Sequence, residues 1–203
     1  MVLFRKTGKD VRVRTLIYYC LSIFFYLQIS DHISFGKVQY PLFTLLEYSF
    51  FAILVFQQLK LNWQKLILIV FSVSFFLFQI IYYFSPEKKR KLDSIPIGIE
   101  TILIFIFIFF FLYEQLRDAK ELPIYDNYFF WVAIGLFIYL GGSFFIYLMG
   151  NTLERQELIK YWFFTYIVET IKNLLLIVAL FVYSKNPNKS NSKQVLPNLD
   201  FML

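Results

Sequence analysis

The chain is predicted to be an all-α integral membrane protein, a bundle of about six transmembrane helices. Of its 203 residues, 59% are hydrophobic and 22% are aromatic, whereas a soluble domain is nearer half apolar. The apolar residues form blocks of about 15 to 23, close to the roughly 20 that a spanning helix needs. No linker divides these blocks, so we expect one transmembrane domain over residues 1–184 and a polar, disordered tail over 185–203.

Each block carries boundary signals of its own. The first is short and is expected to extend at both ends. Pro41 and Pro96 suit the first turn of the second and fourth helices, and Asp93 or Ser94 suits the cap of the fourth. Asn-Thr-Leu-Glu at 151–154 predicts the start of the sixth helix. The predicted spans are 15–29, 41–59, 66–84, 94–113, 129–149 and 161–183.

The distribution of cationic residues predicts the orientation. With the N-terminus inside, twelve Lys and Arg residues lie on the inner side and seven on the outer side. Inner segments of membrane proteins are enriched in these residues, and the first segment usually dominates. The basic loop at 88–91 is an exception, because it falls outside. We therefore expect both termini to be cytoplasmic.

The sixth span carries polar residues in its middle. Trp162, Thr165, Glu169, Lys172 and Asn173 follow helical spacing, so they share one face. Ionisable side chains at this depth are costly and usually face a protein interior or a watery cavity. The other helices are therefore expected to receive this face.

Two more carboxylates are predicted to reach the same place. At a rise of about 1.5 Å per residue, Glu47 and Glu100 lie roughly 9 Å and 8 Å from the outer ends of their spans. Glu169 lies roughly 12 Å deep, and Lys172 nearer the midplane. Three carboxylates and one ammonium are thus expected to meet in an outward-facing pocket, which Asn173 joins.

The fifth span contributes a stripe of small residues. Gly135, Tyr139 and Gly142 share a face, and Ser143 follows. Small residues permit close helix packing in membranes, and the Tyr139 hydroxyl can donate a hydrogen bond to the cluster. Simpler interpretations remain open: Glu169 and Lys172 neutralise each other as an i, i+3 pair. Glu47 and Glu100, near helix ends, reach the lipid headgroups. The stripe of Gly135, Tyr139 and Gly142 serves packing alone.

Several kinds of site are not expected. His32 is the single histidine of the chain, so a histidine-based triad or a zinc site is not predicted. No Gly-rich phosphate loop, CxxC or HExxH occurs. The run at 88–91 is typical of a solvated or headgroup-binding loop. We expect no metal, no cofactor and no nucleic acid.

Several motifs together resemble a known group of proteins. They are Pro-Leu-Phe-Thr-Leu-Leu-Glu-Tyr at 41–48, Gly-Ile-Glu-Thr at 98–101, Leu-Tyr-Glu at 112–114, Phe-Trp-Val-Ala-Ile-Gly-Leu-Phe-Ile-Tyr at 130–139 and Lys-Asn-Leu at 172–174. The chain resembles small, uncharacterised polytopic inner-membrane proteins of Gram-negative bacteria over most of residues 10–183. Its relatives carry one more span, which makes seven. The resemblance implies a location in a bacterial inner membrane and the importance of Glu47, Glu100 and Lys172. It implies no activity.

Three functions are weighed. The leading hypothesis is a non-enzymatic module in the lipid bilayer that binds a small ligand, a lipid or a membrane protein partner through the polar cluster. Such a module serves as a sensor or a complex subunit. The second is an intramembrane hydrolase acting on lipid, in which paired carboxylates act as acid and base. The third is a proton- or cation-coupled carrier, which the missing internal repeat disfavours.

Overall fold

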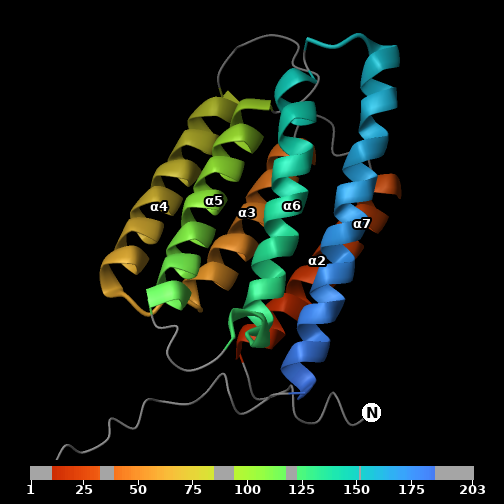
Figure 1. The fold of residues 1–203 in the computed structure, drawn as a ribbon. Coiled ribbons are helices and arrows are strands. Elements are labelled where there is room, and N and C mark those ends of the chain that lie inside the picture. Colours follow the sequence, from red (N-terminus) through yellow and green to blue (C-terminus); the bar gives the residue numbers. More distant parts are fainter. Residues whose placement is uncertain (1–10, 33–38, 85–93, 118–122, 151, 186–203) are drawn as a thin grey trace, which may run out of the picture.

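The structure is a computed structural model that describes residues 11–32, 39–84, 94–117, 123–150 and 152–185. Within these ranges the chain forms six α-helices and one short 3-10 helix, with no strand (Figure 1). Their bounds are α2 Val11–His32, α3 Gln39–Phe56, α4 Asn62–Phe84, α5 Ser94–Arg117, η2 Ile124–Asp126, α6 Tyr128–Met149 and α7 Arg155–Lys185.

All six α-helices are long and apolar enough to cross a membrane, which makes the chain a multi-pass membrane protein. The predicted six-helix bundle is confirmed, and each predicted span lies on one helix except the second, whose last residues, 57–59, follow the end of α3. The first span extends at both ends, to Val11 and His32. The tail at 186–203, the basic loop at 88–91 and the cap candidate Asp93 lie outside the described residues.

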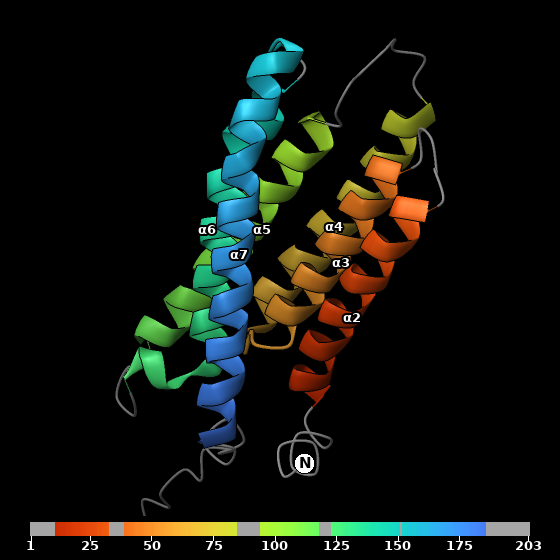
Figure 2. The same cartoon turned by 90° about the vertical axis from the view of Figure 1, so that its right-hand side faces the viewer.

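The helices form two layers of three (Figure 2). One layer contains α2, α3 and α4, and the other contains α5, α6 and α7. Between the layers, α5 packs on α3 and α4. Within the second layer, α6 and α7 make the most extensive contact of the bundle. The start of α2 and the end of α7 lie at the same end of the bundle, which we call the Val11 end (Figure 1).

Helix boundaries agree with most of the local signals. Pro41 and Pro96 lie in the first turns of α3 and α5. Ser94 begins α5, and its hydroxyl donates to the carbonyl of Tyr147 on the neighbouring α6. The sixth helix begins at Arg155, directly after the predicted start signal at 151–154, of which Asn151 lies outside the described residues. Residues 152–153 form a turn that bonds back to Met149.

The turn at residues 57–61, between α3 and α4, joins both layers at the Val11 end. The Gln57 amide donates to the Thr15 hydroxyl on α2 at 2.9 Å, and the Gln58 amide donates to the Tyr128 hydroxyl on α6 at 2.7 Å. The buried Glu114 carboxylate of α5 accepts backbone N–H groups of this turn. Side chains of three other helices therefore hold the turn.

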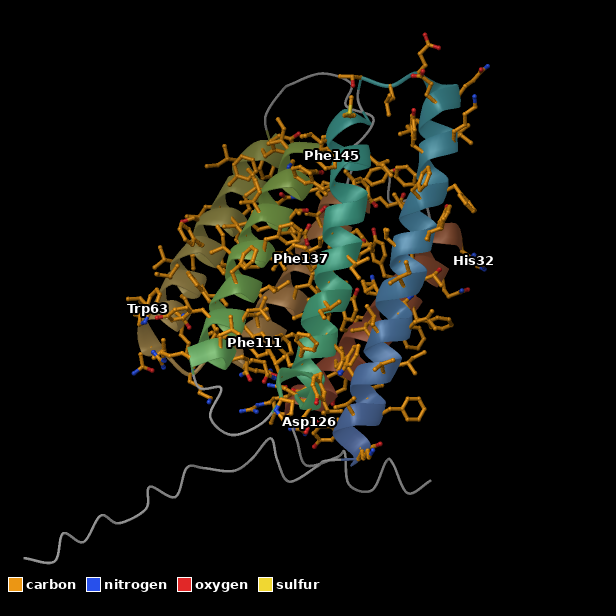
Figure 3. The ribbon with its side chains drawn as sticks, viewed as in Figure 1. His32, Trp63, Phe111, Asp126, Phe137 and Phe145 are labelled. Carbon is orange, nitrogen blue, oxygen red and sulfur yellow. The ribbon has the colours of Figure 1, made fainter. Side chains whose placement is uncertain are left out.

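The outer surface of the bundle is apolar and aromatic, as a lipid-facing surface requires. Trp63 and His32 point outward on opposite flanks of the bundle (Figure 3). Asp126 and Phe145 lie toward its opposite ends in the same view. His32 is exposed and is the last residue of α2, beyond the end of the predicted first span at 29.

Candidate functional site

Glu47 lies at the centre of a buried hydrogen-bond network. It is the ninth of the 18 residues of α3 and is 4% exposed. The Tyr19 hydroxyl on α2 donates to Oε1 at 3.4 Å, and the Tyr139 hydroxyl on α6 donates to Oε2 at 3.1 Å. The Nζ of Lys172 on α7 lies 3.7 Å from Oε1 and forms an ion pair with it. Both oxygens of Glu47 are thus engaged by side chains of other helices.

Lys172 is held as closely as Glu47. It is 2% exposed, and its Nζ donates to the Tyr19 hydroxyl at 2.9 Å. The same ammonium lies 3.9 Å from the centroid of the Tyr139 ring and 5.6 Å from that of Tyr19. A cation over an aromatic face gains about 2 kcal/mol or more when it is desolvated. The two tyrosines therefore bind the carboxylate through their hydroxyls and the ammonium through a hydroxyl and two rings.

We call Tyr19, Glu47, Tyr139 and Lys172 the polar cluster. Its members come from four helices, two in each layer, so the cluster bridges the layers. Tyr19 was not among the predicted site residues, because it is one of 15 tyrosines and carries no charge. The spacing of the helix could have found it, because Tyr19 lies three residues after Leu16 and four before Ile23, on the same face of α2. Leu16 and Ile23 are both buried.

The glycines of α6 set the distance to α7. A Cβ at Gly142 would lie 2.5 Å from Cγ1 of Val168, closer than real carbon atoms approach. A Cβ at Gly135 would lie 3.5 Å from the backbone oxygen of Lys172. Ser143 is buried, and its hydroxyl donates to the carbonyl of Tyr139 at 2.7 Å. This close packing brings the Lys172 ammonium against the Tyr139 ring.

Glu100 lies near the cluster without bonding to it. It is 2% exposed, and its Oε1 has no hydrogen-bond partner in the described part of the chain. The charges of Glu47 and Lys172 act on it electrostatically. Glu100 is the seventh of the 24 residues of α5, nearer the end of the bundle opposite the Val11 end. Long polar side chains near helix ends often reach the lipid headgroups. Glu47 and Glu100 instead lie buried inside the bundle.

The structure separates two of the predicted members from the cluster. Asn173 is exposed, because one residue along a helix turns the side chain by about 100° from the buried Lys172. Glu169 is half-buried and acts on Glu47 through its charge. The ion pair that Lys172 makes in the described residues is with Glu47 on α3, not with Glu169 along its own helix.

The cluster combines one carboxylate, one ammonium and two phenols, which can exchange hydrogen bonds or protons with one another or with a polar guest. Within the described residues, no group of three or more His, Cys, Asp or Glu is placed to hold a metal ion. Comparisons of the chain with known protein families, with curated proteins and with solved structures find no match.

Proposed function

We propose that the chain is a membrane-embedded module that binds a small ligand, a lipid or a partner protein through the polar cluster, as a sensor or a subunit of a membrane complex. The observation that carries this proposal is the Glu47–Lys172 pair, whose two charges belong to different layers. The network around it is made of side chains, which can change partners without unfolding a helix.

The energetics of a buried ion pair support a functional role. Replacing such a pair by apolar residues of similar volume is often neutral or stabilising, so stability alone gives little reason to keep it. Ionisable groups inside transmembrane bundles commonly mark binding sites or ion paths. Among the described residues of α3, α6 and α7, Glu47 and Lys172 are the buried charged side chains, and most of the other buried positions of these helices are apolar.

Binding at the cluster would act on the contact between the layers. An anionic group of a guest, such as a carboxylate or a phosphate, would compete with Glu47 for Lys172. A donor group would compete with Lys172 and the tyrosines for Glu47. Either exchange weakens a link between α3 and α7, while the turn at 57–61 still ties the layers together at the Val11 end. Such a change in the contact between the layers would be the signal to a partner.

A lipid-acting hydrolase is the second candidate. It is favoured by the electrostatic interaction between Glu47 and Glu100, because two neighbouring carboxyl groups can hold different protonation states and act as acid and base. In that case a lipid that co-purifies with the protein should turn over during incubation. A guest that remains chemically unchanged favours the binding module.

The decisive experiment is native purification followed by mass spectrometry of bound lipids, small molecules and proteins. The wild type should carry a stoichiometric guest, and the double variant Glu47→Leu with Lys172→Leu should insert and fold but lose it. The matched control is Tyr48→Phe with Ser72→Ala, which removes a partly buried hydrogen bond of 2.9 Å between α3 and α4 and should keep the guest. A double variant at 47 and 172 that keeps its guest at wild-type stoichiometry would contradict the proposal.

We also propose a bacterial inner membrane, with both termini in the cytoplasm. The bias of cationic residues toward the N-terminal side supports this orientation, and the resemblance to Gram-negative membrane proteins supports this membrane. A cysteine at Lys89, in a Cys20-free background, should then react with a membrane-impermeant maleimide in cells whose outer membrane is permeabilised. Labelling that appears only after lysis would reverse the orientation.

A further inference from the structure

Two buried glutamates on α5 differ in their partners. Glu114 accepts three backbone hydrogen bonds of 2.8–3.0 Å from Lys60 and Leu61. Glu100, about four turns earlier on the helix, is equally buried, yet its Oε1 has no partner in the described residues. A carboxylate is costly to bury unless it is hydrogen-bonded and paired. Glu100 lacks the hydrogen bonds that compensate the burial of Glu114, so it needs another source of compensation.

The surrounding charges do not supply this compensation. In the described part of the chain, Lys172 is the one buried cationic side chain, and it is already bound to Glu47 and Tyr19. The buried face of α4, which packs on α5, is uncharged and includes Gln79, whose amide atoms also have no hydrogen-bond partner in the described residues. The titratable groups that act on Glu100 or on which it acts come from α3, α6 and α7: Glu47, Tyr48, Tyr147 and Lys172.

When Glu47, Glu100 and Lys172 are all ionised, two carboxylates face one ammonium. One more positive charge is then required to neutralise them. A divalent metal ion would need about six oxygen ligands, and the described residues show no cluster of acidic or histidine ligands that supplies them. A proton needs only the carboxyl oxygen itself. Burial in a medium of low dielectric also favours the neutral form of a carboxyl group.

We propose that Glu100 binds one proton, and that this proton keeps Lys172 on Glu47. Release of the proton turns the Glu100 carboxyl into a carboxylate, which competes with Glu47 for the Lys172 ammonium. Because Glu100 and Lys172 belong to the same layer, this exchange would remove the ion pair between the layers. Protonation of Glu100 would thus regulate the polar cluster, a role that rests on the proposed function. The proton itself can be detected without a guest.

The test is infrared spectroscopy of the purified full-length protein, with ¹³C-labelled glutamate to assign the bands. A protonated carboxyl group has a carbonyl stretch that an ionised one lacks. The wild type should show this glutamate band at neutral pH and lose it at high pH. Glu100→Gln should lack the band, whereas the matched control Glu114→Gln should keep it. Absence of the band from the wild type at neutral pH would overturn the proposal, whether or not either variant folds.

The thermal stability provides a second readout. Because the folded wild type would hold one proton more than the unfolded chain, its melting temperature should fall as pH rises. Glu100→Gln keeps a neutral side chain at every pH, so its melting temperature should depend less on pH. Equal pH responses would contradict the proton site. A melting temperature that rises with sodium in place of choline, and no longer does so in Glu100→Gln, would overturn the proton in favour of a metal cation.

Discussion

Glu47 and Glu114 are both buried carboxylates that accept several hydrogen bonds, but their donors differ. The donors to Glu114 are main-chain N–H groups of the turn at 57–61, which cannot leave without unfolding that turn. The donors to Glu47 are two tyrosine hydroxyls, with the Lys172 ammonium as its ion-pair partner. The difference indicates that a carboxylate satisfied by backbone groups fixes the fold, whereas one satisfied by side chains from both layers can exchange its partners.

The largest expected effect is on Lys172. Lys172→Leu leaves Glu47 buried and unpaired, which should cost about 3–5 kcal/mol of unfolding free energy and reduce expression. The double variant Glu47→Leu with Lys172→Leu should recover most of this loss. Denaturant titrations in detergent micelles measure both. If the single variant is as stable as the wild type, Lys172 does not compensate Glu47.

The sequence alone suggests a different rescue. If Glu169 and Lys172 neutralised each other, the double variant Glu169→Leu with Lys172→Leu should be stable. Because the ion pair lies between Lys172 and Glu47, we expect this double variant to be as unstable as Lys172→Leu. Recovery of its expression level would favour the pairing along α7.

Glu114→Gln should come next. Its amide presents a donor to N–H groups that need an acceptor, and hydrogen bonds to charged groups are worth about 1.5–3 kcal/mol in proteins. We expect a loss of stability of this order with no loss of the guest bound at the cluster, measured by denaturant titration and by mass spectrometry of the same preparation. Loss of the guest at preserved stability would break the distinction between the two carboxylates.

Gly142→Ala tests the packing that positions Lys172. The added Cβ would meet Val168 at 2.5 Å, and overpacking typically costs about 1–3 kcal/mol. Gly98→Ala is the matched control, because its added Cβ would lie 3.8 Å from the nearest side-chain atom and helical alanine is favoured over glycine. Relative to the wild type, the melting temperature should therefore fall in Gly142→Ala and rise in Gly98→Ala. Equal melting temperatures would show that α6 and α7 can separate freely.

Tyr139→Phe should have the smallest effect. It removes one hydrogen bond to Glu47 but keeps the ring beneath the Lys172 ammonium. Side-chain hydrogen bonds inside membrane proteins contribute about 0.6 kcal/mol on average. Tyr139→Leu also removes the ring, so it should be less stable than Tyr139→Phe in the same titration. Equal losses in the two variants would argue against the cation–π contact.

The spans could be predicted because uninterrupted apolar blocks and prolines at helix starts are local signals. The placement of Glu47, Glu100, Tyr139 and Lys172 inside the bundle also follows from the cost of exposing polar groups to lipid. The pairing of these residues could not be predicted in this way. Nearly uniform apolar spans show little amphipathicity and leave the rotation of each helix undetermined. Tyr19 was missed because an uncharged tyrosine in an apolar span gives no such cost, and Asn173, which the sequence placed in the cluster, is exposed because it lies about 100° around α7 from Lys172.

The central claim is that Lys172 is paired across the layers with Glu47 and not along α7 with Glu169. Double-mutant cycles on the unfolding free energy, one for residues 47 and 172 and one for 169 and 172, test it most directly. The coupling between 47 and 172 should exceed about 1 kcal/mol, and the coupling between 169 and 172 should be smaller by more than the error of such cycles, about 0.5 kcal/mol. A larger coupling between 169 and 172 would contradict the ion pair that bridges the layers.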